Sequence, residues 1–95
     1  MSEMSLEEQI RCMKEMRAYL DDFCKLMQQE MDKLQNDIKY LRSQGFSKEE
    51  EETYQKNYYA PANSEVERVV NDIRQRHFSY IDKVVEHLEK ALNEQ

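Results

Sequence analysis

Residues 41–55, LRSQGFSKEEEETYQ, decide the fold of this 95-residue chain. They contain its only glycine, Gly45, and four consecutive acids. Gly45 stands where a residue with positive φ is expected to end a helix, because glycine has no Cβ to clash there. Ser47 then opens a capping box with Glu50, and the acids suit the positive end of a helix dipole. The stretch predicts the end of one helix, a turn at 44–47 and the start of a second helix.

The segment before this turn repeats apolar residues every seven positions. Ser5 and Glu8 match a capping box at its start, and the periodicity then predicts a helix from about residue 6 to 43. We expect one apolar stripe on this helix to form a core or an interface. Its members are Leu6, Ile10, Met13, Met16, Leu20, Phe23, Cys24, Met27, Met31, Leu34, Ile38 and Leu41.

The second predicted helix covers about residues 48–93 and contains the only proline, Pro61. Proline removes a backbone donor and clashes with the preceding turn, while Ser64 and Glu67 match a third capping box. The helix therefore either kinks near Pro61 or stops and restarts within 61–64. The apolar residues expected to face a core or an interface beyond this point include Val66, Val70, Ile73, Tyr80, Val84 and Leu88, with His77 and Ile81 on the same stripe.

Two long helices joined by a short turn make an all-α, antiparallel two-helix hairpin, here a single domain over 1–95. A layer of two helices cannot shield both apolar stripes from water, and a domain with so small a core usually needs a partner. We expect the hairpin to pair into a four-helix bundle. The partner is either a second copy, a related helical hairpin or a larger helical protein.

Composition excludes several classes of partner. Lysine and arginine number 14 against 20 acids, which gives a net charge of −6. Because the basic residues are also scattered, we expect no nucleic acid ligand. No apolar run approaches a spanning helix, so we expect no membrane insertion. The N-terminal sequence lacks the basic and apolar regions of a Sec signal peptide, and we expect synthesis and folding in the cytoplasm.

Residues that could carry chemistry are few and poorly placed for it. His77 and His87 lie ten positions apart and lack the Glu-x-x-His spacing of a bundle metal site. Cys12 and Cys24 are about 18 Å apart along one predicted helix, too far for a disulfide. We expect them to be reduced packing residues, an interchain bridge being the alternative. No nucleophile motif or phosphate-binding loop occurs, so we expect no enzyme, metal or cofactor.

Aromatic residues gather at the turn and the start of the second helix. Phe46, Tyr54, Tyr58 and Tyr59 fall within fourteen positions. They form either a small aromatic cap that closes the hairpin end or a docking surface for a larger protein.

The aromatic pair at the turn resembles a motif of the small Trp-x-Gly helical hairpins exported by type VII secretion systems. That family has Trp-x-Gly in its turn and an aromatic residue eight positions after the tryptophan. Phe46 stands at the tryptophan position and Tyr54 eight positions later, whereas Lys48 occupies the glycine position and the glycine lies at Gly45. The resemblance implies an all-α hairpin that is a secretion substrate or pairs with a larger secreted protein.

The family or its partners also carry an export signal, an aromatic residue followed four positions later by an acid. Phe78 and Asp82 match this pattern, and as a signal they would share an exposed face. The function expected from the resemblance is therefore a type VII secretion-associated substrate or targeting partner, exported without a cleaved signal. The alternative is an intracellular coiled-coil adaptor, assembly factor or regulator.

Overall fold

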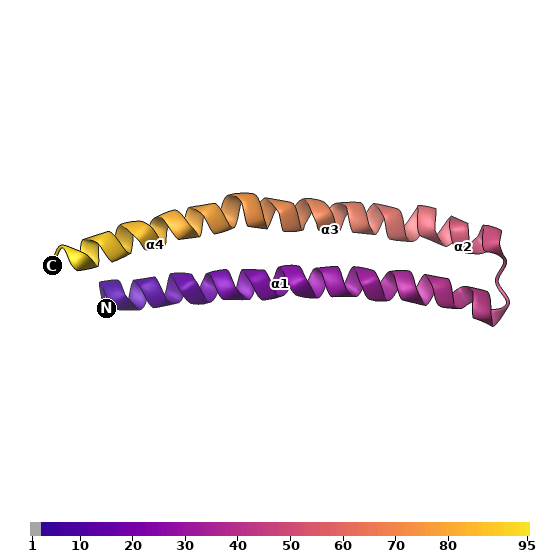
Figure 1. Ribbon diagram of the computed structural model, residues 1–95, viewed down its shortest axis with the longest axis horizontal. Coiled ribbons are helices and arrows are strands. Elements are labelled where there is room, and N and C mark those ends of the chain that lie inside the picture. Colours follow the sequence, from indigo (N-terminus) through magenta and orange to yellow (C-terminus); the bar gives the residue numbers. More distant parts are fainter. Residues whose placement is uncertain (1–2) are drawn as a thin grey trace. The chain divides into compact units, whose positions relative to one another are not determined.

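The computed structural model describes residues 3–95, which form an all-α helical hairpin without strands in that range (Figure 1). The first limb, α1 (Leu6–Tyr40), ends in the 3₁₀ turn η1 (Leu41–Gln44). The second limb is helical without interruption from Lys48 to Asn93 and includes two π-helical turns. Its segments are α2 (Lys48–Tyr54), η2 (Gln55–Tyr59), α3 (Ala60–Asp72), η3 (Ile73–His77) and α4 (Phe78–Asn93).

The turn between the limbs has the predicted chemistry. Gly45 adopts φ +95°, and the Phe46 N–H donates to the Leu41 carbonyl at 3.2 Å, which closes the end of the first limb. The Ser47 hydroxyl accepts from the Glu50 N–H at 3.1 Å, and the Glu50 carboxylate accepts from the Ser47 N–H at 3.2 Å. Both halves of the capping box are therefore present.

The second limb does not break at Pro61. Ser64 lies inside α3, so the second of the two alternatives, a stop and restart within 61–64, does not occur. The π-turn η2 ends at Tyr59, two residues before the proline, and the Ala60 N–H donates to the Gln55 carbonyl, five residues back. This wider turn accommodates the proline ring where an α-turn would clash with it.

Contacts along the chain define two compact units. Unit 1 comprises the residues up to Phe23 together with Asn71–Gln95, and unit 2 comprises Cys24–Val70. The seam is the row of apolar residues with which one limb faces the other. In unit 2 the buried seam residues are Cys24, Ile38, Val66 and Val70, and in unit 1 they are Ile10, Ile73, Phe78 and Ile81.

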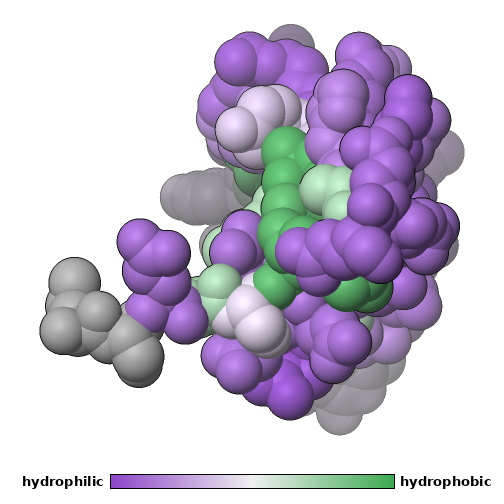
Figure 2. Space-filling model, turned by 90° about the vertical axis from the view of Figure 1, so that its left-hand side faces the viewer, coloured by the Kyte–Doolittle hydropathy of each residue, from purple (hydrophilic) through white to green (hydrophobic). Residues whose placement is uncertain are grey.

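The seam of unit 1 is a narrow apolar row between charged flanks. Figure 2, which looks at the end that carries the chain termini, shows green apolar surface between hydrophilic residues. Leu6, Met13, Leu20, Val84 and Leu88 are half-buried beside the buried residues. In unit 2 the predicted stripe residues Met27, Met31, Leu34 and Leu41 are also half-buried.

The π-turn η3 shifts the seam by one residue. The buried residues Ile73 and Phe78 are five positions apart, whereas a regular helix repeats its face after three or four. One extra residue rotates everything after it by about 100°. For this reason Tyr80 does not lie in the core of unit 1 as expected but is 67% exposed, and His77 is exposed as well.

The same shift occurs at η2. Tyr54 and Tyr59, five positions apart, are both half-buried, while Tyr58 is exposed. Both shifts are visible in the sequence as apolar spacings of five. These spacings of five are hard to recognise, because Tyr58 and Tyr80 at the neighbouring positions complete a regular helical pattern of apolar residues.

We predict that deleting Gln75, an exposed residue of η3, changes the free energy of unfolding by less than about 1 kcal/mol. The deletion turns the π-turn into an α-turn and keeps Phe78 four positions after Ile73, in phase with the seam. Deleting Glu86 from α4 should cost about 2 kcal/mol or more, because it rotates Leu88 out of the seam. Urea titrations of the two variants check this, and equal losses would contradict the proposed role of the π-turn.

Candidate functional site

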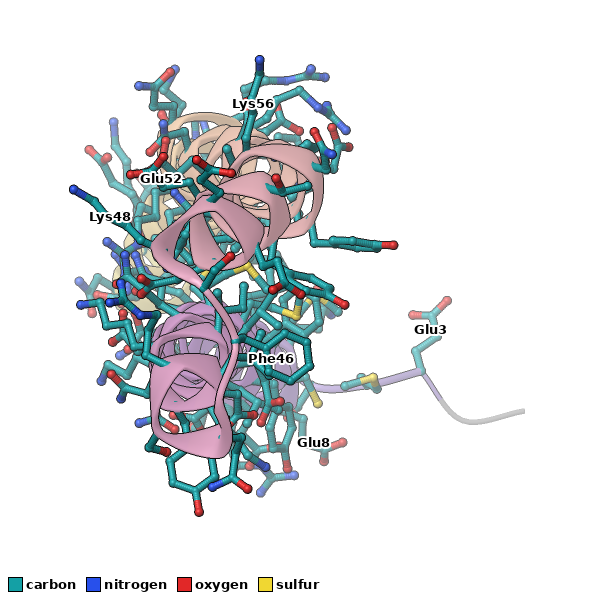
Figure 3. All side chains as sticks on the ribbon, turned by 90° about the vertical axis from the view of Figure 1, so that its right-hand side faces the viewer. Glu3, Glu8, Phe46, Lys48, Glu52 and Lys56 are labelled. Carbon is teal, nitrogen blue, oxygen red and sulfur yellow. The ribbon has the colours of Figure 1, made fainter. Side chains whose placement is uncertain are left out.

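Three residues of the aromatic cluster at the turn contact one another. The rings of Phe46 and Tyr54 meet edge to face with centroids 6.3 Å apart, and Tyr54 stacks on Tyr58 at 5.4 Å. Figure 3 shows Phe46 beside the turn, while Lys48 projects outward from α2. Phe46 and Tyr54 are half-buried. Phe46 and Tyr54, which are eight positions apart, thus contact each other in an arrangement that fits the aromatic cap.

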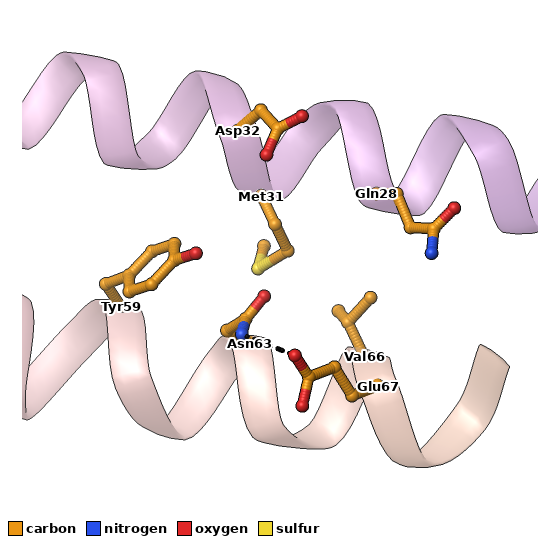
Figure 4. Close-up of a pocket in the computed structure, with 7 residues that line it drawn as sticks. All are labelled: Gln28, Met31, Asp32, Tyr59, Asn63, Val66 and Glu67. Atoms are coloured by element: carbon orange, nitrogen blue, oxygen red, sulfur yellow. Dashed lines mark hydrogen bonds between the residues drawn. The ribbon is translucent and has the colours of Figure 1, made fainter. Parts of the chain in front are cut away.

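A hollow of about 430 Å³ lies between the limbs of unit 2 (Figure 4). α1 contributes Gln28, Met31 and Asp32, and the second limb contributes Tyr59, Asn63, Val66 and Glu67. The Asn63 amide donates to the Glu67 carboxylate at 3.1 Å. Its lining residues include one acid from each limb, Asp32 and Glu67, and no histidine or cysteine.

Residues 3–95 were searched for a metal-binding group and for a membrane-spanning helix. That range contains no group of three histidine, cysteine, aspartate or glutamate residues arranged to hold a metal ion. Within the same range, no helix has the length and apolarity needed to span a bilayer. The pKa of Glu65 lies below its usual value because Arg68 donates hydrogen bonds to it and attracts it electrostatically. This is an exposed ion pair on one helix and marks no catalytic group.

The residues predicted as an export signal do not share an exposed face. Phe78 is buried in the seam of unit 1, because the π-turn rotates it inward. Asp82 is exposed but bonded: the Arg17 Nε lies 2.8 Å from its Oδ1. The structure therefore corrects the expected placement of the aromatic half of this pair.

Arg17 joins the two limbs of unit 1. It stands seven residues before Cys24 and after Ile10, at a seam position that is otherwise apolar. Its guanidinium carbon lies 4.4 Å from the centre of the Phe78 ring while the same group binds Asp82. The Lys14 ammonium group also lies 3.4 Å from the Glu89 carboxylate. One side of unit 1 is thus closed by ion pairs between the limbs.

The opposite side of unit 1 is apolar and open. Cys12 of α1 and Val84 of α4 line a hollow of about 250 Å³, together with Met4, Gln9, Met13 and Leu88. From Cys12 the same helix face continues at spacings of four, three and four, and Tyr80 precedes Val84 by four residues. We call this surface the apolar face of unit 1; it comprises Cys12, Met16, Tyr19, Phe23, Tyr80 and Val84.

The exposure of this face corrects the sequence assignment of α1. Met16 is 52% exposed, Tyr19 71% and Phe23 43%. Met16 and Phe23 were expected on the seam, but each precedes a seam position by one residue and so points about 100° away from it. In the sequence, this face corresponds to a second apolar stripe with alternating spacings of four and three residues. The second stripe is easily mistaken for part of the seam stripe. Cys12, expected to pack inside, is exposed on this stripe, while Cys24 is buried and neither forms a disulfide.

Comparisons with family models, curated proteins and solved structures found no match to this chain. A function must therefore be argued from the surfaces themselves. Among the described residues, the apolar face of unit 1 gathers several of the exposed large apolar side chains on one surface.

We predict that Arg17→Ala lowers the free energy of unfolding by about 1 kcal/mol, because it removes both the ring contact and the bond to Asp82. Lys14→Ala, which loses one exposed ion pair, should cost less than about 0.5 kcal/mol. Urea titrations at one fixed protein concentration measure both values. Equal costs would show that Arg17 acts only as another surface charge.

Proposed function

We propose that this protein is a non-enzymatic association protein whose apolar face packs against helices of another polypeptide chain. The observation that carries the proposal is the exposure of Met16, Tyr19 and Phe23 on one face of α1 beside Tyr80 of unit 1. Contiguous apolar surface with a charged surround is typical of a protein-binding surface. Large aromatic and methionine side chains are also the types enriched in such interfaces.

Burial of this face would contribute free energy to association. Burying one large apolar side chain contributes about 1.5–3 kcal/mol when it starts fully exposed. The side chains of the apolar face start partly covered, so together they supply on the order of 5 kcal/mol per copy. Association offsets part of this through lost rotational and translational freedom, and a second buried face of similar size compensates for that loss.

Within this class we propose a type VII secretion-associated substrate or targeting partner of a larger secreted protein. Support comes from the contact between Phe46 and Tyr54 at the hairpin turn, the pair that has the aromatic spacing of the family motif. An intracellular coiled-coil adaptor, assembly factor or regulator is the second candidate. It is favoured by the burial of Phe78, which removes the aromatic half of the export pattern from the surface.

We predict that a photo-cross-linking amino acid at Tyr19 captures another polypeptide chain in the cells that make this protein. Tyr19 is the most exposed large apolar residue of the face. The same amino acid at Ala18 should give no adduct, because this neighbouring exposed residue points about 100° away. Glu86 is the matched control on α4 for a probe at Tyr80.

The adducts are resolved by electrophoresis and identified by mass spectrometry. Adducts at the face and none at the two controls support the proposal, whichever chain is captured. No adduct from either probe on the face would contradict it.

The secretion-associated form predicts that Asp82→Ala reduces export several-fold when the protein is expressed with a type VII system. Glu86→Ala, an exposed acid one turn later, should leave export unchanged. Arg17→Ala breaks the same ion pair but keeps Asp82. This variant therefore measures how far export changes when only the ion pair is lost. Immunoblots of cells and culture supernatants measure export. Unchanged export of the Asp82 variant would contradict a role of Asp82 in an export signal. Retention of the wild-type protein inside the cells would favour the intracellular adaptor.

A further inference from the structure

We propose that a second copy of this chain covers the apolar face of unit 1, in one particular arrangement. The two copies are related by a twofold axis that runs along the helices, so that α1 of each copy lies over α4 of its partner. This inference rests on the proposed function and names the partner. Charged residues along the two edges of the face carry it.

The edge of the face on α1 is acidic. Glu8, Glu15 and Asp22 follow one another at intervals of seven residues, and all three are exposed. Glu15 also contacts Arg11 on its own helix at 4.0 Å, an exposed pair that contributes little. Glu15 lies three residues after Cys12 and four before Tyr19, so it borders the apolar stripe on the helix surface. A row of charges in this position flanks the apolar stripe of a coiled coil and decides which helix can pair with it.

The edge of the face on the other limb is basic. Lys83 and Lys90 of α4 are seven residues apart, Arg76 lies seven residues before Lys83 in the π-turn η3, and all three are exposed. Lys83 lies three residues after Tyr80 and directly before Val84, so it borders the face as Glu15 does. Arg76 also contacts Asp72 on its own helix at 3.2 Å, an exposed pair that contributes little and leaves other guanidinium donors available.

Two symmetric ways exist to lay this face on a second copy. With the twofold axis across the helices, α1 covers α1, and acidic edge meets acidic edge. With the axis along the helices, α1 covers α4 of the partner, and acidic edge meets basic edge. Like charges in close pairs are unfavourable, whereas opposite charges favour and orient the contact. The edges of unit 1 therefore select the second arrangement.

The register of the limbs agrees with this pairing. Inside one copy Arg17 meets Asp82, which sets the level of the two limbs. An axis along the helices preserves these levels between copies, so Glu15 comes within about one turn of the partner's Lys83. Because α1 and the partner's α4 run in opposite directions, moving seven residues along each helix brings the remaining charges into pairs. Glu8 faces the partner's Lys90, and Asp22 faces the partner's Arg76.

The apolar side chains interlock in the same arrangement. Met16, Tyr19 and Phe23 of one copy lie against Tyr80 and Val84 of the other, as the core of an antiparallel helix pair. The salt-bridged side of unit 1, with Arg17 and Asp82, stays at the outer surface. Two identical interfaces of this kind complete a four-helix bundle at unit 1.

Charge reversal tests the arrangement directly. The variant E15K/D22K reverses two of the three charges of the acidic edge, and R76E/K83E reverses two of the three charges of the basic edge. We expect each variant alone to lose dimerisation by at least tenfold in Kd, because its edges repel those of an identical copy. An equimolar mixture should form a one-to-one heterodimer, because each acidic edge then meets a basic one. Sedimentation equilibrium of the full-length chains measures all three samples, with circular dichroism to verify that they remain helical.

Matched controls carry the same charge changes outside the face. The exposed residues Lys39 and Lys56 of unit 2 are reversed in K39E/K56E, and Glu30 and Asp37 in E30K/D37K. Both control variants should dimerise like the wild type. If they lose the dimer as strongly as the edge variants, net charge and not the edges controls association, which overturns the arrangement.

The remaining outcomes separate this inference from the proposed function. A wild-type chain that stays monomeric at about 100 µM, while the probe at Tyr19 still captures a different protein, overturns the second copy and leaves the association function in place. A dimer whose edge variants do not recover on mixing overturns the axis along the helices. A monomer that also gives no adduct overturns both proposals.

Discussion

A helix in a two-helix hairpin has one neighbour, so the fold can cover only one of its faces. α1 carries two apolar stripes, and the hairpin buries the one that includes Ile10, Cys24 and Ile38. The second stripe, with Met16, Tyr19 and Phe23, is left on the surface of unit 1. The difference between the two sides of unit 1 follows from this limit. One side is closed by Arg17 and its ion pairs, and the other stays apolar.

The two π-turns keep the second limb in contact with the first despite its sequence. Each absorbs one residue, so that Tyr59 follows Tyr54 and Phe78 follows Ile73 at the surface that faces α1. A regular helix would have turned later apolar residues away from the seam. Such turns occur where an extra residue is accommodated without loss of the helix. At η3, the same shift moves Tyr80 from the seam to the apolar face.

The shift at η3 bears on function because it decides which side chains are buried and which are exposed. The shift at η3 takes Phe78 into the seam under the Arg17 guanidinium and leaves Asp82 paired on the surface. The four-residue spacing of an aromatic residue and an acid on one helix is thus not enough to place both on an exposed face. The contact between Phe46 and Tyr54, by contrast, lies in regular turn and helix geometry and matches the spacing of the family motif.

The sequence by itself determined the hairpin, because its boundaries depend on local chemistry. Gly45 ends the first limb and Ser47 with Glu50 begins the second through bonds between residues close in the chain. Which apolar stripe is buried could not be read in the same way, since both stripes of α1 have helical spacing. That choice was made by the tertiary structure, because the second limb can pack against only one side of α1, and the position of each π-turn fixes which of its own side chains reach that side.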